Sequence, residues 1–426
     1  MSDPLFRRPA LLLAMLALCL SRPISAQSTF DAVTLLDDVR ILSQDEFGGR
    51  LVGTPGADSA AAFLARRFRQ VGLRAAPGGW FQSFTVASDA PAAIYAGIGG
   101  ATGRNVIGVL PGHDKDLRNE IVVVGAHYDH LGSGTFGALD PDSVGHIHNG
   151  ADDNASGASA MLHIARQLVR TPPARTVVFI AFSGEEAGLL GSDYYVKHPL
   201  FPLAQTYAMV NMDMVGRLRN DRLLVYGSAT AREFPALLDS LNAEARFDLE
   251  YSGDGWGRSD QSPFYGAGRP VLHIFTGLHD DYHRTTDDWE KINADGLGQV
   301  ANFTSRLVRT LANRTVPLTF VNAPPPVAAG SSTAGAGYGA YLGSIPDMAT
   351  NPGGVRLTGV RAGSPAELGG LLGNDIITRI GETDVGDLQA MTEVLRNHRP
   401  GDVVQIRILR GGVEQRLTVT LGKRGG

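Results

Sequence analysis

Residues 121–130 are Ile-Val-Val-Val-Gly-Ala-His-Tyr-Asp-His, an apolar run that ends directly in a cluster of histidine and aspartate. Unbroken apolar runs of this kind are typical of parallel strands that are buried on both faces of a sheet. Similar runs occur at 176–182, 207–211 and 271–275. Helical patterns, such as that of residues 158–169, fall between them. This alternation of strand and helix predicts a layered α/β domain.

The residues that follow these predicted strands are acidic or histidine. In chain order they are His127, Asp129, His130, Glu185, Glu186, Asp213, His279 and His283. A fifth polar stretch, residues 149–157, contains Asp152 and Asp153 and opens the helix that follows. In open α/β sheets the ligand site lies beyond the carboxyl ends of the strands, so we expect these residues to meet at one edge. Taken singly, each stretch is more typical of a helix cap or a solvated loop.

Several carboxylates in one cleft repel each other and lose hydration, which raises their pKa values until some are protonated. A pair of divalent cations removes this cost. Three carboxylates and two neutral imidazoles compensate most of the charge of two Zn²⁺ ions and leave room for one bound hydroxide. Mixed nitrogen and oxygen ligation with an open position is typical of catalytic zinc, although these ligand types also accept other divalent metals.

The 426 residues include 38 Lys and Arg against 43 Asp and Glu, a formal net charge of −5. This mild acidic balance argues against nucleic acid as a partner, because phosphate binding requires a clustered basic surface. Residues 1–26 are typical of a signal peptide, with Arg7 and Arg8 before an apolar run that is too short to span a bilayer. We expect a periplasmic or secreted protein with no transmembrane segment in the mature chain. The only cysteine, Cys19, lies in the signal peptide, so we expect no disulfide.

The rest of the chain divides into three parts by composition. Residues 27–322 carry the strand and helix patterns described above. Residues 323–337 are rich in Pro, Gly, Ser and Ala and poor in large apolar side chains, which is typical of a linker. Residues 338–426 are numerous enough to form a small second domain.

Five motifs in order resemble the M28 family of zinc metallopeptidases, which includes bacterial aminopeptidases. They are Gly125-Ala-His-Tyr-Asp-His-Leu-Gly132, residues 149–157, residues 182–192, Asn211-Met-Asp-Met214 and Tyr282-His283. The resemblance covers roughly residues 31–312. It implies a three-layer α/β/α zinc-exopeptidase domain with a mostly parallel mixed sheet.

The resemblance also implies a ligand set for two zinc ions per chain. Asp152 would bridge the two ions. His127 and Asp213 would hold one ion, and Glu186 and His283 would hold the other. A cis peptide bond would follow the bridging aspartate.

The same resemblance implies that Glu185 is the general base and that Asp129 orients His127 through its second ring nitrogen. The cis peptide bond expected after the bridging aspartate Asp152 would be Asp152-Asp153. Glu185 would take a proton from a metal-bound water, and the resulting hydroxide would attack the scissile carbonyl. The chain departs from many relatives at Ser259-Asp260-Gln261, where they have Ser-Asp-His, which leaves a substrate contact from this loop in doubt.

Residues 355–366 and 368–377 resemble a PDZ domain, with residues 391–398 as its helix and 403–409 as one of its strands. This implies a small β-rich second domain. PDZ domains bind an extended peptide as an added strand and hold its C-terminal carboxylate with backbone N–H groups. A structural lid or an oligomerisation module is an equal alternative. The peptide-binding loop would consist of Tyr341, Leu342 and Gly343.

Together these features predict an exported di-zinc aminopeptidase that hydrolyses N-terminal residues from peptides. Three alternatives stay open. A C-terminal exopeptidase on the same fold would need a positive patch, which Arg258 or Arg284 could supply. A glutaminyl-cyclase-like enzyme is a second alternative, and the related cyclases use one zinc ion. A catalytically silent peptide-binding protein is the third, and it would not need an intact ligand set. The side-chain preference at the cleavage site, the PDZ ligand and the oligomeric state do not follow from the sequence.

Overall fold

The computed structural model describes residues 26–422, apart from 89–92, 94–95, 140–142, 254, 257–258, 323–339, 347–352, 361–362 and 387. The predicted signal peptide up to residue 25, the predicted linker at 323–337 and Arg258 lie outside the described residues, so these assignments stay predictions. None of the described helices combines the length and the apolar character that crossing a bilayer requires.

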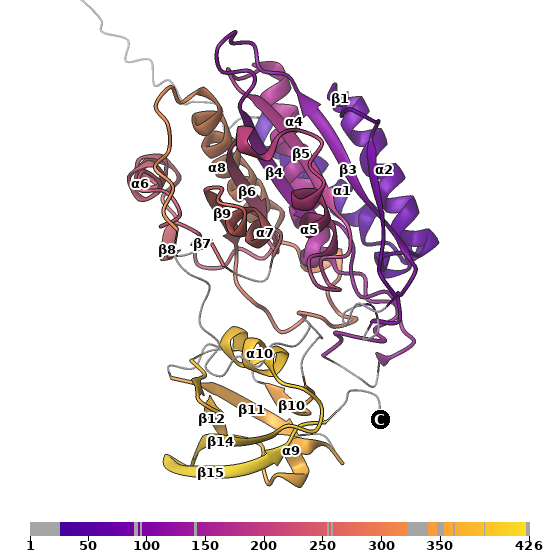
Figure 1. Ribbon diagram of the computed structural model, residues 1–426, viewed down its shortest axis with the longest axis vertical. Coiled ribbons are helices and arrows are strands. Elements are labelled where there is room, and N and C mark those ends of the chain that lie inside the picture. Colours follow the sequence, from indigo (N-terminus) through magenta and orange to yellow (C-terminus); the bar gives the residue numbers. More distant parts are fainter. Residues whose placement is uncertain are drawn as a thin grey trace, which may run out of the picture.

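A nine-stranded mixed sheet forms the centre of the larger unit (Figure 1). Its strand order is β1-β3-β5-β4-β6-β9-β7-β8, and β2 also pairs with β3. The central strands β5, β4, β6 and β9 run parallel, as the sequence predicted. The strands are β1 (Arg74–Ala75), β2 (Phe81–Thr85), β3 (Thr102–Leu110), β4 (Ile121–His127), β5 (Thr176–Phe182), β6 (Thr206–Met212), β7 (Arg222–Tyr226), β8 (Asp248–Ser252) and β9 (Val271–Phe275).

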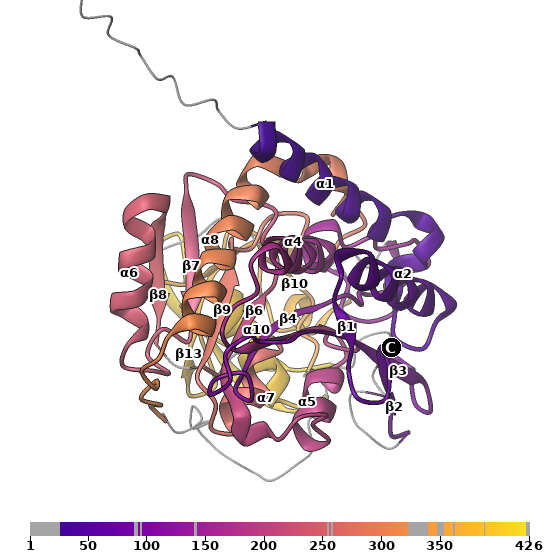
Figure 2. The ribbon, with the colours of Figure 1, turned by 90° about the horizontal axis from the view of Figure 1, so that it is seen from above.

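Helices cover both faces of this sheet, which confirms the predicted three-layer architecture. Figure 2 shows α1, α2, α4 and α8 on one side and α5 and α7 on the other, while α6 packs against α8 beside β7 and β8. The helices are α1 (Ala26–Leu42), α2 (Pro55–Val71), α4 (Gly157–Arg170), α5 (Leu190–Lys197), α6 (Phe234–Ala245), α7 (Gln261–Gly266) and α8 (Ala294–Asn313). Short turns of 3-10 or wider helix lie at Asp45–Arg50, Ala151–Ser156, Leu203–Gln205 and Trp289–Lys291.

The alternation of side chains along the buried strands builds two apolar cores. Val122 and Val124 of β4 pack into the core beneath α1, α2, α4 and α8. Ile121 and Val123 of the same strand pack on the opposite face, with Phe264 of α7. Because both faces are covered, every residue of β4 is buried, which explains the unbroken apolar run in the sequence.

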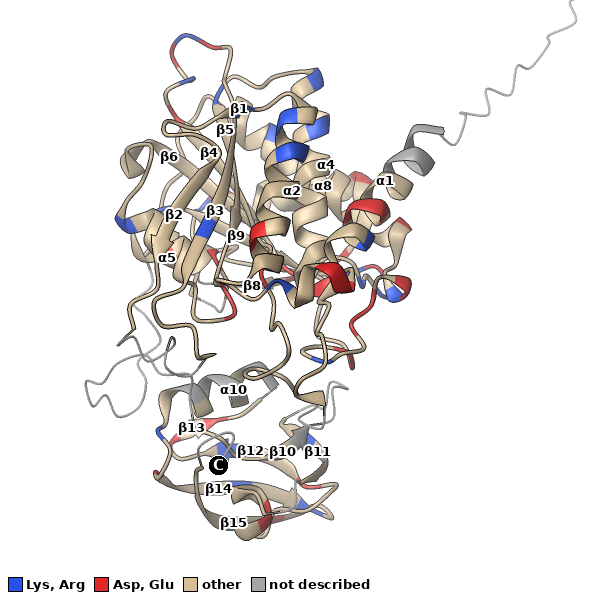
Figure 3. Cartoon of the chain, turned by 90° about the vertical axis from the view of Figure 1, so that its right-hand side faces the viewer, with Lys and Arg blue, Asp and Glu red and all other residues tan. Residues whose placement is uncertain are grey.

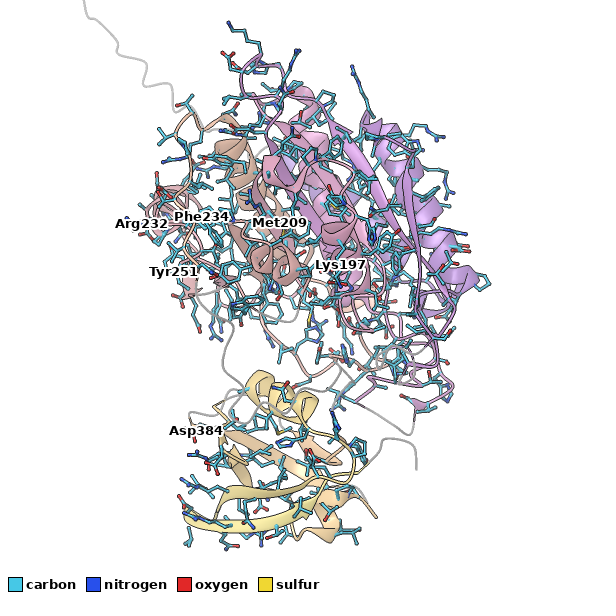
Figure 4. The ribbon with its side chains drawn as sticks, viewed as in Figure 1. Lys197, Met209, Arg232, Phe234, Tyr251 and Asp384 are labelled. Carbon is cyan, nitrogen blue, oxygen red and sulfur yellow. The ribbon has the colours of Figure 1, made fainter. Side chains whose placement is uncertain are left out.

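The smaller unit has a six-stranded antiparallel sheet and an apolar core of its own, formed by residues between 340 and 421 (Figure 1). Figure 4 marks Met209 in the larger unit and Asp384 in the smaller one. The predicted helix and strand both form, as α10 and β14. The elements are β10 (Ser344–Pro346), β11 (Val355–Val360), α9 (Pro365–Leu368), β12 (Ile376–Ile380), β13 (Thr383–Asp384), α10 (Leu388–Asn397), β14 (Val403–Arg410) and β15 (Val413–Thr420).

Candidate metal centre

The predicted ligands lie on loops that leave the carboxyl ends of the central parallel strands. His127 is the last residue of β4, Glu186 follows β5, and Asp213 directly follows β6. His283 lies in the loop after β9. In Figure 3 acidic residues gather towards the lower half of the larger unit, while basic residues colour the upper parts of α2 and α4. The sheet therefore brings residues that are far apart in the sequence to one edge.

One group of ligand atoms centres on His127. Its Nε2 atom lies 3.2 Å from Oδ1 of Asp213 and 3.3 Å from Oδ1 of Asp153. Its Nδ1 atom lies 3.2 Å from the backbone carbonyl oxygen of Asp129, to which it can donate. Such a hydrogen bond fixes the tautomer that leaves Nε2 unprotonated, the form that binds a metal. The ligand atoms of His127, Asp153 and Asp213 all lie within 4.8 Å of one another.

A second group centres on Glu186 and His283. Nε2 of His283 lies 3.1 Å from Oε2 of Glu186 and 3.2 Å from Oδ2 of Asp153. Its Nδ1 atom lies 3.0 Å from the carbonyl oxygen of Gly137, which again fixes the tautomer. The two carboxylate oxygens of Asp153 therefore face two different histidines, which is the arrangement that a carboxylate bridging two metals requires.

His130 competes with His283 for a place in this second group. Its Nδ1 atom lies 2.7 Å from Oε1 of Glu186 but 3.9 Å from Oδ2 of Asp153, and the set His130, Asp153 and Glu186 also falls within 4.8 Å. A single nitrogen of His283 is close to both carboxylates, whereas His130 is close only to Glu186. The geometry therefore favours His283 as the ligand and His130 as the partner that holds Glu186.

The bridging position was predicted one residue too early. Asp152 is fully buried but faces away from both groups: its Oδ1 accepts a hydrogen bond from the backbone N–H of Gly216 at 2.6 Å, and its Oδ2 lies 3.1 Å from Nε2 of His279. The residue between the two histidines is Asp153. Neighbouring side chains point in different directions, and the backbone leaves helical geometry at Asp153 (φ −104°, ψ 92°), so the sequence pattern could not decide between two adjacent aspartates.

The predicted cis peptide bond is also displaced by one residue. It lies at Asp153-Asn154 and not at Asp152-Asp153. It therefore follows the aspartate whose two oxygens lie close to His127 and His283. Asn154 secures this turn, since its side-chain amide donates to the carbonyl oxygen of Met212 and its Oδ1 accepts from the N–H of Met214.

Glu185 lies beside His127 of the first group. Its Oε2 atom is 4.0 Å from Nε2 of His127, and its side chain is 10% exposed. The Asp129 carboxylate accepts the backbone N–H groups of Glu185 and Glu186, at 3.1 Å and 3.4 Å. Asp129 therefore lies at the second ring nitrogen of His127, where it was expected: its backbone carbonyl oxygen is 3.2 Å from Nδ1 and its Oδ1 is 3.9 Å away. Its carboxylate also fixes the loop that carries both glutamates.

The pKa values show how strongly these groups interact. Burial alone would lower the pKa of His283, but the carboxylates of Glu186 and Asp153 raise it to about 10. Burial of His127 is likewise outweighed by Asp213 and Glu185, which raise its pKa well above the usual imidazole value. Burial instead raises the pKa of Glu185 well above its usual value, with help from Glu186 and Asp213.

These groups fit a pair of divalent metal ions. The carboxylates around the two imidazoles raise their pKa values, because negative charges in a buried cluster need a counter-charge. Metal ions bound there would supply that charge in place of the protons. The donor set combines imidazole nitrogen with carboxylate oxygen and shares the two oxygens of Asp153 between the groups, which suits zinc.

Two buried carboxylates near the cluster, Asp287 and Asp260, were not among the predicted site residues. Asp287 accepts the backbone N–H groups of Asp152 and Asp153 through Oδ2, at 2.9 Å and 3.0 Å. Burial, together with the charge of Asp152, raises its pKa to about 7. Its position four residues after His283 could have indicated it, because a residue this close in sequence to a predicted ligand is expected to lie near the site. Asp260 of the divergent Ser-Asp-Gln stretch is also fully buried, and burial raises its pKa to about 7.

In the smaller unit, the predicted peptide-binding loop is held at several points. The backbone of Tyr341 pairs with Gly422, and the carbonyl oxygen of Leu342 accepts the N–H of Ala366 at 2.7 Å. Gly343 has φ 78°, and a Cβ atom there would lie 2.3 Å from Cβ of Ser364, so only glycine fits. The loop leads into β10, which lies at the end of the sheet beside β11.

Solved structures that share this fold include a zinc aminopeptidase and a Zn-dependent exopeptidase. The structure is similar to BSAP, a zinc aminopeptidase from Bacillus subtilis, with a TM-score of 0.54 and 20% identity over 66% of this chain and 95% of that chain. It is equally similar to Bacteroides thetaiotaomicron glutaminyl cyclase bound to N-acetylhistamine (TM-score 0.55, 20% identity, 66% and 98% of the two chains). These likenesses establish the fold, and the second shows that the fold alone does not select the reaction.

Residues 105–308 match the model of peptidase family M28, and residues 340–421 match that of the PDZ domain. The chain therefore contains an M28 peptidase domain followed by a PDZ domain, which confirms the resemblance found in the sequence. Aminopeptidase YwaD of Bacillus subtilis (strain 168) is 32% identical over 218 residues, which are 49% of this chain and 44% of that relative. The chain spans less than half the length of the curated relatives it matches.

Proposed function

We propose that the protein is an exported aminopeptidase that uses two zinc ions to remove N-terminal residues from peptides. The observation that carries this proposal is the position of Asp153, whose two carboxylate oxygens face His127 and His283. The relationship to Aminopeptidase YwaD supports the reaction type. The signal-peptide pattern of residues 1–26 supports export, and the N-terminal sequence of the mature protein would test it.

In this proposal Asp153 would be shared between the two metal ions. His127 and Asp213 would hold one ion, and Glu186 and His283 would hold the other. Zinc bound there would supply Lewis-acid polarisation of the scissile carbonyl and of the attacking water. His130 and the carbonyl oxygens behind the imidazoles keep the ligands in place.

Glu185 acts as the general base and then as the general acid. Its carboxylate is buried enough to have a raised pKa, and its side chain stays 10% exposed. A raised pKa brings a carboxylate closer to the working pH, which favours both the uptake and the return of a proton. Glu185 would therefore take a proton from the attacking water and deliver it to the leaving amine.

Metal removal tests the proposed function directly. The protein freed of metal by a chelator is expected to be inactive on a chromogenic amino-acid amide, because no metal then polarises the scissile carbonyl of the substrate. Titration with zinc should restore hydrolysis and reach its plateau at two equivalents per chain. The N-acetylated amide serves as the control substrate, since an aminopeptidase needs a free amine.

Other outcomes would point to other members of this fold. Equal hydrolysis of the acetylated and free substrates would contradict the aminopeptidase assignment, and release of C-terminal residues would indicate the carboxy-terminal alternative. Cyclisation of an N-terminal glutamine with one zinc per chain would indicate the cyclase alternative. Zinc binding without any turnover would indicate a silent binding protein.

We further propose that the PDZ domain holds the C-terminus of peptide substrates. The strand β10 pairs only with β11 among the described strands, which leaves an edge onto which a peptide can add. The preceding loop, Tyr341 to Gly343, is fixed by Ala366 and Gly422. Because the N–H of Tyr341 donates to Gly422, the carboxylate would be held by the N–H groups of Leu342 and Gly343.

Deletion of residues 323–426 is expected to raise KM for long peptides while leaving KM and kcat for an amino-acid amide unchanged. The larger unit should fold alone, because its three apolar clusters draw on no residue of the smaller unit. Steady-state kinetics on peptides of increasing length provide the measurement. The same length preference in the full and shortened chains would rule out peptide capture.

A further inference from the structure

The turn Asp45–Arg50 has an unusual backbone next to the metal centre. Gly48, Gly49 and Arg50 all have positive φ, at 54°, 68° and 52°. A Cβ atom on Gly49 would lie 2.5 Å from the carbonyl oxygen of Gly132, so glycine is required there. Arg50 lacks the conformational freedom of glycine, and positive φ is unfavourable for a residue with a long side chain. Non-glycine residues in this conformation persist where the surrounding structure imposes it, often at functional sites.

The side chain of Arg50 is fully buried and donates four hydrogen bonds to backbone carbonyl oxygens. Its Nε donates to Tyr128 at 2.6 Å, and its Nη2 donates to Gly150 at 2.8 Å. Its Nη1 donates to Leu42 and to Asn149, both at 2.6 Å. The guanidinium group therefore ties together three segments that are distant in the sequence.

Two of these segments carry the metal ligands. The Tyr128 carbonyl lies between His127 and Asp129, on the loop after β4. The Gly150 carbonyl lies just before the turn that carries Asp153. Arg50 itself lies in residues 26–104, outside the region 105–308 that matches the peptidase family, so the N-terminal part of the chain reaches into the centre.

The charge of Arg50 also suits this place. Burial lowers its pKa to about 10, and the nearby carboxylates of Asp129 and Asp153 oppose that decrease. In the four hydrogen bonds described above every acceptor is a neutral carbonyl, so none of them withdraws a carboxylate from the metals. The guanidinium thus gives a fixed positive charge near the cluster while leaving the ligands free.

We propose that Arg50 is a positioning residue that sets the distance between the His127 loop and the Asp153 turn, and so adjusts the site for two metal ions. The inference rests on the proposed function for its catalytic consequences, but metal affinity alone can test it. Lysine cannot replace arginine here, because its single ammonium lacks the planar fork that reaches acceptors in several directions.

Arg175 offers a matched control at the opposite end of the sheet. It is also buried, it precedes β5, and it donates to the carbonyl oxygens of Leu311 and Arg314 and to the Glu120 carboxylate. Arg50→Lys and Arg175→Lys should therefore cause similar losses of stability. Only Arg50→Lys should also disturb the metal site.

The experiment compares both variants with the wild-type full-length chain. Zinc dissociation constants come from competition with a chromophoric chelator, and the unfolding midpoint of each metal-free protein gives its stability. We expect Arg50→Lys to weaken zinc binding by roughly 10- to 100-fold, the usual effect of losing a partner that orients metal ligands. We also expect kcat to fall more than KM rises. Equal zinc affinity in Arg50→Lys and Arg175→Lys would overturn the inference.

A measurement on the wild type covers the case in which Arg50→Lys does not fold. Amide hydrogen exchange of the wild-type protein should slow at residues 45–51 when zinc is added, although none of these residues is a proposed ligand. Residues around Arg175 should not respond. If exchange at 45–51 is unchanged by zinc, Arg50 does not link its turn to the metal centre. If the wild type binds zinc but hydrolyses nothing, the proposed function fails while this inference stands.

Discussion

Replacing Asp153 with asparagine is expected to remove most zinc binding and with it nearly all hydrolysis. Its two oxygens lie 3.3 Å and 3.2 Å from Nε2 of His127 and His283, so both metal positions depend on it. An amide offers one neutral oxygen in place of two charged ones. The loss in affinity should exceed the roughly 10- to 100-fold that is typical when an outer hydrogen-bond partner of a metal site is removed. Zinc content after dialysis and kcat/KM on an amino-acid amide provide the measurements.

Asp152→Asn is the matched control, because the two aspartates are adjacent, fully or almost fully buried and chemically identical. The Asp152 oxygens accept from Gly216 and face His279, away from the metal positions. An asparagine there should lower stability by about 1–3 kcal/mol, the cost of disturbing a buried hydrogen-bonded group. It should leave two zinc ions bound. If the effects of the two substitutions were reversed, Asp152 would be the bridging residue after all.

The sequence predicted the strands and the edge of the site because both depend on local patterns. A strand buried on both faces must be apolar at every position, and β5 and β9 begin and end where these runs begin and end. The ligands then follow from topology, since parallel neighbours end at the same edge. His127 and Asp213 lie next to strand ends, where the backbone leaves little freedom, and their side chains meet as predicted.

The predictions failed where the backbone is irregular. Asp152 and Asp153 lie in a turn whose φ and ψ values depart from helical geometry, and no periodic pattern fixes the direction of a side chain there. Asp129 does contact the second ring nitrogen of His127, but no pattern indicated that its backbone carbonyl oxygen would lie closer than its carboxylate. Arg50 could not be found at all, because its acceptors are backbone carbonyls, which every residue possesses.

Glu185→Gln is expected to keep both zinc ions and to lower kcat by roughly 10²- to 10⁴-fold, the usual contribution of a general acid–base group. Glutamine keeps the shape of the side chain and cannot accept the proton. Zinc should stay because the ligand atoms of both groups belong to other residues, and Oε2 of Glu185 lies 4.0 Å from Nε2 of His127, farther than the oxygens of Asp153 and Asp213. Zinc content and steady-state kinetics on an amino-acid amide separate the two effects.

The neighbouring glutamate supplies the control for this prediction. Glu186 lies 3.1 Å from Nε2 of His283 and 2.7 Å from Nδ1 of His130, well inside the second group of ligand atoms. Burial and Asp153 favour its protonated form, but His283 and His130 prevail and lower its pKa to about 2, so it is charged and ready to bind a cation. Glu186→Gln should therefore lose zinc together with activity. If Glu186→Gln kept zinc and Glu185→Gln lost it, Glu185 would be the ligand and Glu186 the general base. The Asp129 carboxylate would then hold this loop in a different register from the one in the structure.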